Sequence, residues 1–206
     1  MLVAIFFAYI SIYPFLQGLR RPSTQKEMWR FTLIYLIIAA IFGLPILFLH
    51  PKIIFIVFLM VPSFLINLYF LKHNNERAFI NNLAALLPLN STVLISYYIG
   101  THQYDLMALT LFLLVFLFFL SSVFYVKVSI RERDNKVFIT IAKLYMLILP
   151  LFGLWLSGVY LMLAYLFSTV IIFLPASSDK ISAKRIGFIE IFNTIWFVIF
   201  ITLAYL

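Results

Sequence analysis

The stretch FFLSSVFYVKVSIRERDNK, residues 118–136, indicates what kind of protein this chain is. It begins as the end of a long apolar segment and continues, without a glycine or proline, into a run of charges that contains Lys127, Arg131, Glu132 and Arg133. An apolar helix that ends in a dense group of charges is typical of a membrane span where it reaches the lipid headgroups. The stretch therefore predicts a helical membrane protein with a charged end.

The composition of the whole chain agrees with this prediction. Hydrophobic residues make up 65% of the 206 residues and charged residues 11%, and the mean hydropathy is +1.12. A soluble domain is close to half apolar and a quarter charged, so a soluble globular protein is excluded. The apolar runs are continuous and do not alternate with polar residues, which excludes the strands of a membrane β-barrel. The sequence predicts an all-α, polytopic transmembrane helical bundle.

Eight segments are apolar enough and long enough to be membrane spans. They are residues 2–16, 31–49, 53–71, 83–99, 106–126, 137–156, 159–174 and 186–206. No long polar region separates them, so residues 1–206 are expected to form a single integral membrane domain.

The basic residues are distributed unevenly between the loops. Alternate loops, at 18–30, 72–82, 127–136 and 175–185, hold four, two, four and three of them, whereas the loops between hold one in total, Lys52. Basic loops stay in the cytoplasm, so these four loops are expected there, with both termini on the outer side of a bacterial cytoplasmic membrane. This topology also explains the net charge of +8, so membrane lipids are the expected partners and nucleic acid is not.

Three segments resemble one known family: NNERAFINN (74–82), FYVKVSIRER (124–133) and KRIGFIEIFN (184–193). They are similar to the YwiC-like family of uncharacterised bacterial multi-pass membrane proteins. Members usually begin with a further span, so this chain looks like a form without the first helix. With that span the layout would have nine helices and would be similar to the UbiA prenyltransferases, whose Asp-rich magnesium motifs this chain does not contain.

Lys127 and Arg131 are the first candidate ligand-binding residues. They lie four residues apart, so on a continued helix they share one face in the headgroup zone. Together with Arg133 they predict a site for a phosphate or diphosphate, with Glu132 beside it. The alternative is that these side chains only anchor the helix at the membrane surface.

A second cluster comprises Asn75, Glu76, Arg77 and Asn81. The functional prediction is a polar site at a helix N-terminus that faces the Lys127 cluster across the cytoplasmic mouth. The alternative is helix capping, because an Asn at 74 or 75 and an acid in the first turn both favour a helix start. Neither cluster contains a cofactor motif or a metal-ligand pattern, so neither a cofactor nor a metal site is expected.

Polar residues inside a span are costly to bury, and they therefore often have a function. Lys143 lies about 10 Å into its span by helical rise. Glu190 enters from the same side, and Asn193 follows one turn deeper. These depths predict a Lys143–Glu190 ion pair, with extension of Lys143 to the interface as the alternative.

Three functions fit these patterns. The first is a protein that handles lipids or isoprenoids, a binder or a transferase, and holds an anionic headgroup at the basic end. The second is a small secondary transporter that uses Lys143, Glu190 and Asn193. The third is a structural or accessory membrane subunit.

Overall fold

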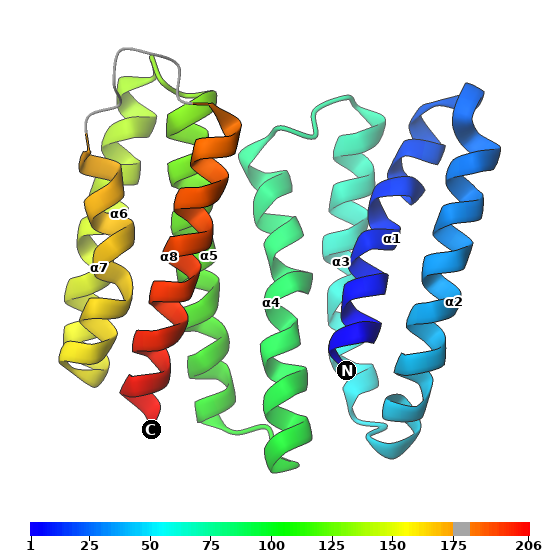
Figure 1. Cartoon of the computed structure of the whole chain (residues 1–206), viewed down its shortest axis with the longest axis horizontal. Helices are drawn as coiled ribbons and strands as arrows, with labels where there is room; N and C mark the ends of the chain where they lie inside the picture. The colour runs from blue at the N-terminus through cyan, green and yellow to red at the C-terminus, as the bar shows by residue number, and fades with distance from the viewer. Residues whose placement is uncertain (175–181) are drawn as a thin grey trace. The chain divides into compact units, whose positions relative to one another are not determined.

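The computed structural model describes residues 1–174 and 182–206, and within them it contains eight α-helices and one short 3-10 helix (Figure 1). Their bounds are α1 Leu2–Arg20, η1 Pro22–Thr24, α2 Gln25–Leu49, α3 Ile53–Lys72, α4 Phe79–Thr101, α5 Leu106–Ile130, α6 Lys136–Ser157, α7 Val159–Phe173 and α8 Ala183–Tyr205. Each predicted span coincides with one helix. The prediction of a polytopic helical bundle is confirmed.

Seven of the described helices are long and apolar enough to cross a membrane. The exception is α7, which has 15 residues and is therefore about 22 Å long by helical rise. The hydrocarbon core of a bilayer is about 30 Å thick. The chain is thus a multi-pass membrane protein in which α7 is apolar but shorter than a typical span.

The turn between α3 and α4 shows how local sequence ends a helix. Asn74 adopts a left-handed conformation with φ of 54°, and the amide of Asn75 donates to the carbonyl of Phe70 at 2.9 Å. This is the common way to close a helix C-terminus, and Asn tolerates it better than most residues. The predicted capping of α4 by Asn74 or Asn75 is wrong, because α4 begins only after Ala78.

The chain forms two compact units, residues 1–113 and 114–206. In the first unit α1 packs along α2 and α3 packs along α4, whereas α1 and α3 touch less extensively. At the end of the unit opposite the α3–α4 turn, these helices and the start of α5 share an apolar core of Ile53, Ile56, Leu94, Ile95, Tyr98 and Ala108. This core joins the two helix pairs at one end, and towards the other end Phe15 of α1 contacts Phe64 of α3 with the ring centroids 5.8 Å apart.

In the second unit α7 packs between α6 and α8, and the rest of α5 contributes to the same core. Phe118 of α5 stacks on Phe197 of α8 with the ring centroids 4.0 Å apart. A Cβ atom added at Gly153 would lie 2.7 Å from the carbonyl oxygen of Leu161, so glycine is what lets α6 and α7 approach so closely. Small residues have this use wherever membrane helices pack tightly.

Hydrogen bonds between helices fix the arrangement of the second unit. The hydroxyl of Tyr165 on α7 donates to the carbonyl of Leu114 on α5 at 2.9 Å. The indole nitrogen of Trp196 on α8 donates to the carbonyl of Leu163 on α7 at 2.7 Å. Such bonds define which helix faces meet, because apolar side chains gain little by leaving lipid for protein.

Candidate functional site

The first unit contains a cavity of about 850 Å³ between its two helix pairs. This volume lies in the range of about 300–1,000 Å³ that is usual for ligand pockets. All four of its long helices line it: Tyr9, Ile10, Ile12, Tyr13, Pro14 and Leu16 from α1, Met28, Phe31 and Tyr35 from α2, Met60, Phe64 and Asn67 from α3, and Ala85, Pro88 and Leu89 from α4.

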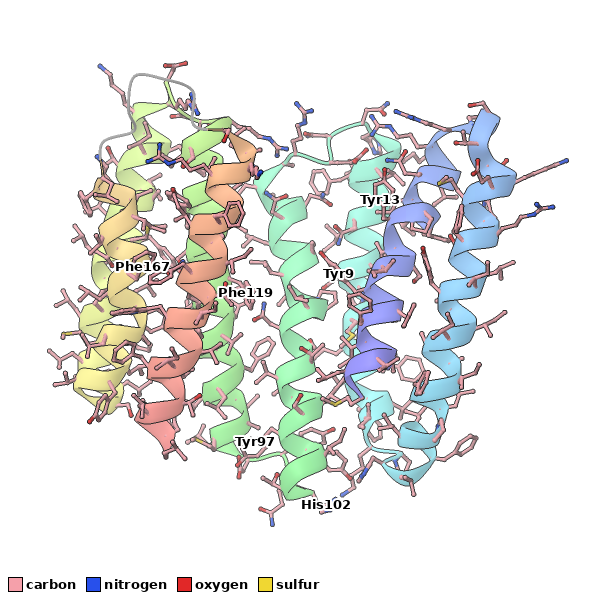
Figure 2. All side chains as sticks on the ribbon, in the orientation of Figure 1. Tyr9, Tyr13, Tyr97, His102, Phe119 and Phe167 are labelled. Carbon is pink, nitrogen blue, oxygen red and sulfur yellow. The ribbon has the colours of Figure 1, made fainter. Side chains whose placement is uncertain are left out.

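The cavity wall is mostly apolar and opens to the surroundings beside α1. Tyr9 and Tyr13 are 59% and 69% exposed and lie along the side of α1 that faces α3 and α4 (Figure 2). Among the few polar groups in the wall is Asn67, whose amide nitrogen donates to the carbonyl of Ser63 at 2.8 Å. The opening lies among helices that are long and apolar enough to cross a membrane.

An ion pair lies next to one end of the cavity. Arg20 Nη1 is 3.0 Å from Glu76 Oε1, and the two side chains are 45% and 39% exposed. Arg20 follows the lining residue Leu16 by four positions, which is about 6 Å along α1. The pair joins the end of α1 to the α3–α4 turn. Arg20 was not among the predicted site residues, although it lies in the basic loop 18–30.

Asn81 stabilises the α3–α4 turn from within α4. Its amide nitrogen donates to the backbone carbonyl of Glu76 at 2.7 Å, while its Oδ1 is buried without a hydrogen-bond partner. Asn75 and Arg77 are exposed beside it. The structure thus joins Asn81 to the backbone of Glu76, and Arg20 to the side chain of Glu76, while the binding role of this cluster stays a prediction.

This end of the first unit carries a strong positive charge. The segments 18–30 and 72–82 together contain six Lys and Arg side chains and two Glu side chains. They lie at the same end because α1 ends, α2 begins, α3 ends and α4 begins there. An apolar cavity therefore lies beside a basic surface.

The Lys127 cluster lies in the second unit, where α5 ends. Lys127 is only 5% exposed, so its side chain is packed within the protein and does not extend freely from the surface as an anchor would. The amides of Arg131 and Glu132 both donate to its carbonyl at 2.8 Å, and α5 ends at Ile130. Arg131 is therefore the first residue after the helix, although its amide still makes the bond of a helical turn to Lys127, and the shared face of the two side chains stays a prediction.

The neighbouring charges of this cluster are held by local bonds. The guanidinium of Arg133 donates to the carbonyl of Ser129, which helps to close α5. Glu132 accepts from the side chain of Asn135 at 2.8 Å, and Asn135 caps α6 by accepting from the amide of Phe138 at 3.1 Å. The described bonds assign Glu132 and Arg133 a structural role in the α5–α6 turn.

The predicted Lys143–Glu190 pair is wrong. Within the part of the chain that the structure describes, the two side chains form no ion pair. Lys143 lies over the ring of Phe173 on α7, with Nζ 5.4 Å from the centroid, whereas Glu190 on α8 accepts a hydrogen bond from Ser122 on α5. Lys143 and Glu190 were predicted at similar depths, but their side chains do not point towards each other, because Lys143 on α6 faces α7.

Asn193 is fully buried beside this carboxyl group. Its Oδ1 accepts from the hydroxyl of Ser168 on α7 at 3.0 Å. Asn193 and Glu190 lie three residues apart, so they share one face of α8. Neither Ser122 nor Ser168 was predicted from the sequence, because isolated hydroxyl groups are common in membrane helices.

Comparisons with known proteins place the chain in a family. A family model described as YwiC-like protein matches residues 1–97. An uncharacterized protein of Haemophilus influenzae is 30% identical over 205 residues, which are 99% of this chain and 85% of the relative. The uncharacterized protein YwiC of Bacillus subtilis is 31% identical over 191 residues, which are 93% of this chain and 79% of the relative. No solved structure matches the chain, so the similarity of layout to UbiA stays a prediction. The resemblance seen in the sequence is confirmed: the chain belongs to the YwiC-like family.

Proposed function

We propose that the protein binds an amphiphile whose alkyl or isoprenyl chain occupies the cavity of the first unit and whose phosphate contacts the basic end. The observation that carries this proposal is the pairing, within one unit, of an apolar cavity of about 850 Å³ with a basic surface one helical turn beyond it. A chain that already lies in lipid gains little hydrophobic free energy by entering protein. The phosphate contacts and the shape of the cavity would therefore determine which amphiphile binds.

Arg20 is the principal phosphate ligand in this proposal. Its ion pair with Glu76 is half exposed, and such pairs contribute only about 0–1 kcal/mol, so a phosphate can compete for the guanidinium. Arginine binds phosphate through two parallel, charge-assisted hydrogen bonds. Asn75 and Arg77 lie in the adjacent turn and Asn81 lies in the first turn of α4, and together they complete a polar surface for the headgroup.

The second basic cluster is proposed as a separate contact for anionic lipid. Lys127 places a nearly buried amine at the end of α5, and Arg131 is exposed beside it. With both basic ends in the cytoplasm, the first and last residues of the chain would lie on the outer side of a bacterial cytoplasmic membrane.

The experiment that tests this proposal is mass spectrometry of the lipids that stay bound to the protein in mild detergent. Wild type is compared with Arg20→Gln, with Arg131→Ala and with the control Lys52→Gln, which removes a positive charge outside the basic segments of the first unit. We expect one enriched phosphate-bearing amphiphile in wild type and in the control, and its loss in Arg20→Gln. Bulk membrane lipid in equal proportions in all four proteins would contradict the proposal.

A small secondary transporter is the second candidate function. It is supported by the buried polar side chains of the second unit, Glu190 and Asn193, since such groups often mark substrate or ion pathways. Lys143 would then act from α6, independently of Glu190. Accumulation of a solute in vesicles that is lost in Glu190→Gln would favour this function over lipid binding.

A further inference from the structure

A buried polar cluster joins three helices of the second unit. It consists of Ser122 on α5, Ser168 on α7, and Glu190 and Asn193 on α8. Ser168 and Asn193 have no exposed surface, and Glu190 Oε1 is buried as well. The cluster belongs to the second unit, so it does not depend on the function proposed for the cavity of the first unit.

Two hydrogen bonds use half of the polar atoms of Glu190 and Asn193. The hydroxyl of Ser122 donates to Glu190 Oε2, and the hydroxyl of Ser168 donates to Asn193 Oδ1 at 3.0 Å. Glu190 Oε1 and Asn193 Nδ2 are buried and have no partner. One hydrogen-bond acceptor, Glu190 Oε1, and one donor, Asn193 Nδ2, thus have no partner, and their residues share one face of α8.

Among the described residues, no cationic side chain forms an ion pair with Glu190. On α5, Tyr125 lies within electrostatic range of Glu190. On α6, Lys143 lies over Phe173, and on α7 the contact to the cluster is the neutral Ser168. Arg185, at the start of α8, acts on Tyr125. A buried carboxylate with one hydrogen bond and no cation is costly, and uptake of a proton removes that cost.

We propose that Glu190 is a proton-binding site within the membrane and that Asn193 provides a partner for both of its protonation states. In the charged state Nδ2 donates to Glu190 Oε1, while Oδ1 keeps its bond from Ser168. When Glu190 takes up a proton, the amide turns over. Oδ1 then accepts the new O–H of Glu190, and Nδ2 donates to the hydroxyl oxygen of Ser168, which donates to a carbonyl of its own helix.

This geometry favours a proton over a metal cation. Oxygen atoms alone would surround a bound cation, but here the buried Asn193 Nδ2, a donor without a partner, belongs to the residue one helical turn from Glu190. No group of three or more acidic or histidine side chains suited to a metal occurs among the described residues. A bound proton needs one oxygen to carry it and a second atom to accept the resulting hydrogen bond, and Glu190 and Asn193 supply these two atoms.

The test is labelling with dicyclohexylcarbodiimide, an apolar reagent that reacts with protonated carboxylic acids inside membranes. The carboxyl oxygen bonds to the carbodiimide carbon, and the acid proton moves to its nitrogen. Protein in vesicles is labelled from neutral to acidic pH, and the modified residue is identified by peptide mass spectrometry. We expect modification of Glu190 that increases as the pH falls and is absent in Glu190→Gln.

Two serine variants test the geometry without removing the acid. Ser122→Ala removes the donor that stabilises the charged form, so half-maximal labelling should move to higher pH. Ser121→Ala, whose hydroxyl donates to Phe118 of its own helix, should leave the labelling curve unchanged. No labelling of Glu190, labelling independent of pH, or protection by sodium ions at constant pH would overturn the proposal, the last because it would indicate a cation site. The wild-type curve and the serine variants decide the matter even if Glu190→Gln does not fold.

Discussion

Filling the cavity of the first unit should weaken amphiphile binding without disturbing the fold. Ala85 lines the cavity and is exposed, so a phenyl ring placed there by Ala85→Phe points into open space. A phenyl ring needs roughly 150 Å³, the size of a cavity that holds one benzene. That is about a sixth of the 850 Å³ available. A bound chain would have to share the remaining space, and overpacking typically costs about 1–3 kcal/mol.

This cost corresponds to a loss of affinity of about 5-fold to 150-fold. The assay is titration of detergent-solubilised protein with farnesyl phosphate, followed by intrinsic tryptophan fluorescence, with farnesol as the uncharged comparison. The control is Leu87→Phe, on the same helix, because Leu87 is exposed but does not line the cavity. Equal affinity in wild type, Ala85→Phe and Leu87→Phe would refute the assignment of the cavity as the chain-binding site.

Three further predictions concern stability. Gly153→Ala should lower the free energy of unfolding by about 1–3 kcal/mol in a denaturant titration, because its Cβ would lie 2.7 Å from the backbone of Leu161. The control is Gly187→Ala, which has open space around it and should leave the free energy of unfolding unchanged or raise it by up to about 1 kcal/mol. Tyr165→Phe should cost about 1 kcal/mol, since a buried interhelical hydrogen bond is lost, and unchanged stability would contradict this. The pKa of Asp105 is lowered, chiefly by the hydrogen bond that its carboxylate accepts from the amide of Ala108. The carboxylate therefore stabilises the α4–α5 turn at pH values above its unfolded-state pKa, and this stabilisation is lost as the pH falls through its folded-state pKa. The difference in melting temperature between wild type and Asp105→Asn should therefore shrink on acidification.

The positions of the helices could be predicted from the sequence because each apolar run is long and ends at charged residues, proline or glycine. The depth of a polar residue followed from the same counting. Its direction around the helix axis did not, since lipid-facing and protein-facing sides are both apolar and show no periodicity. For this reason the sequence gives the depth of Lys143 and Glu190 in their helices, whereas the predicted ion pair between them is wrong.

The candidate sites also depended on contacts between distant parts of the chain. Ser122 and Glu190 are separated by 68 residues, and the hydrogen bond between them exists only because α5 and α8 meet at that level. Arg20 and Glu76 meet for the same kind of reason, since both lie at turns of the first unit. The cavity left no signal in the sequence beyond the prolines of its wall, such as Pro14 and Pro88.

The most direct test of the central claim is to locate the bound amphiphile on the chain. Protein in vesicles is photo-crosslinked to an isoprenyl phosphate that carries a diazirine in its chain, and the labelled peptides are mapped with and without excess farnesyl phosphate. We expect competed labels on cavity-lining residues of α1 and α4, such as Tyr13 and Leu89. Labels spread evenly over the lipid-facing helices and unaffected by competitor would contradict the claim that this cavity binds the ligand.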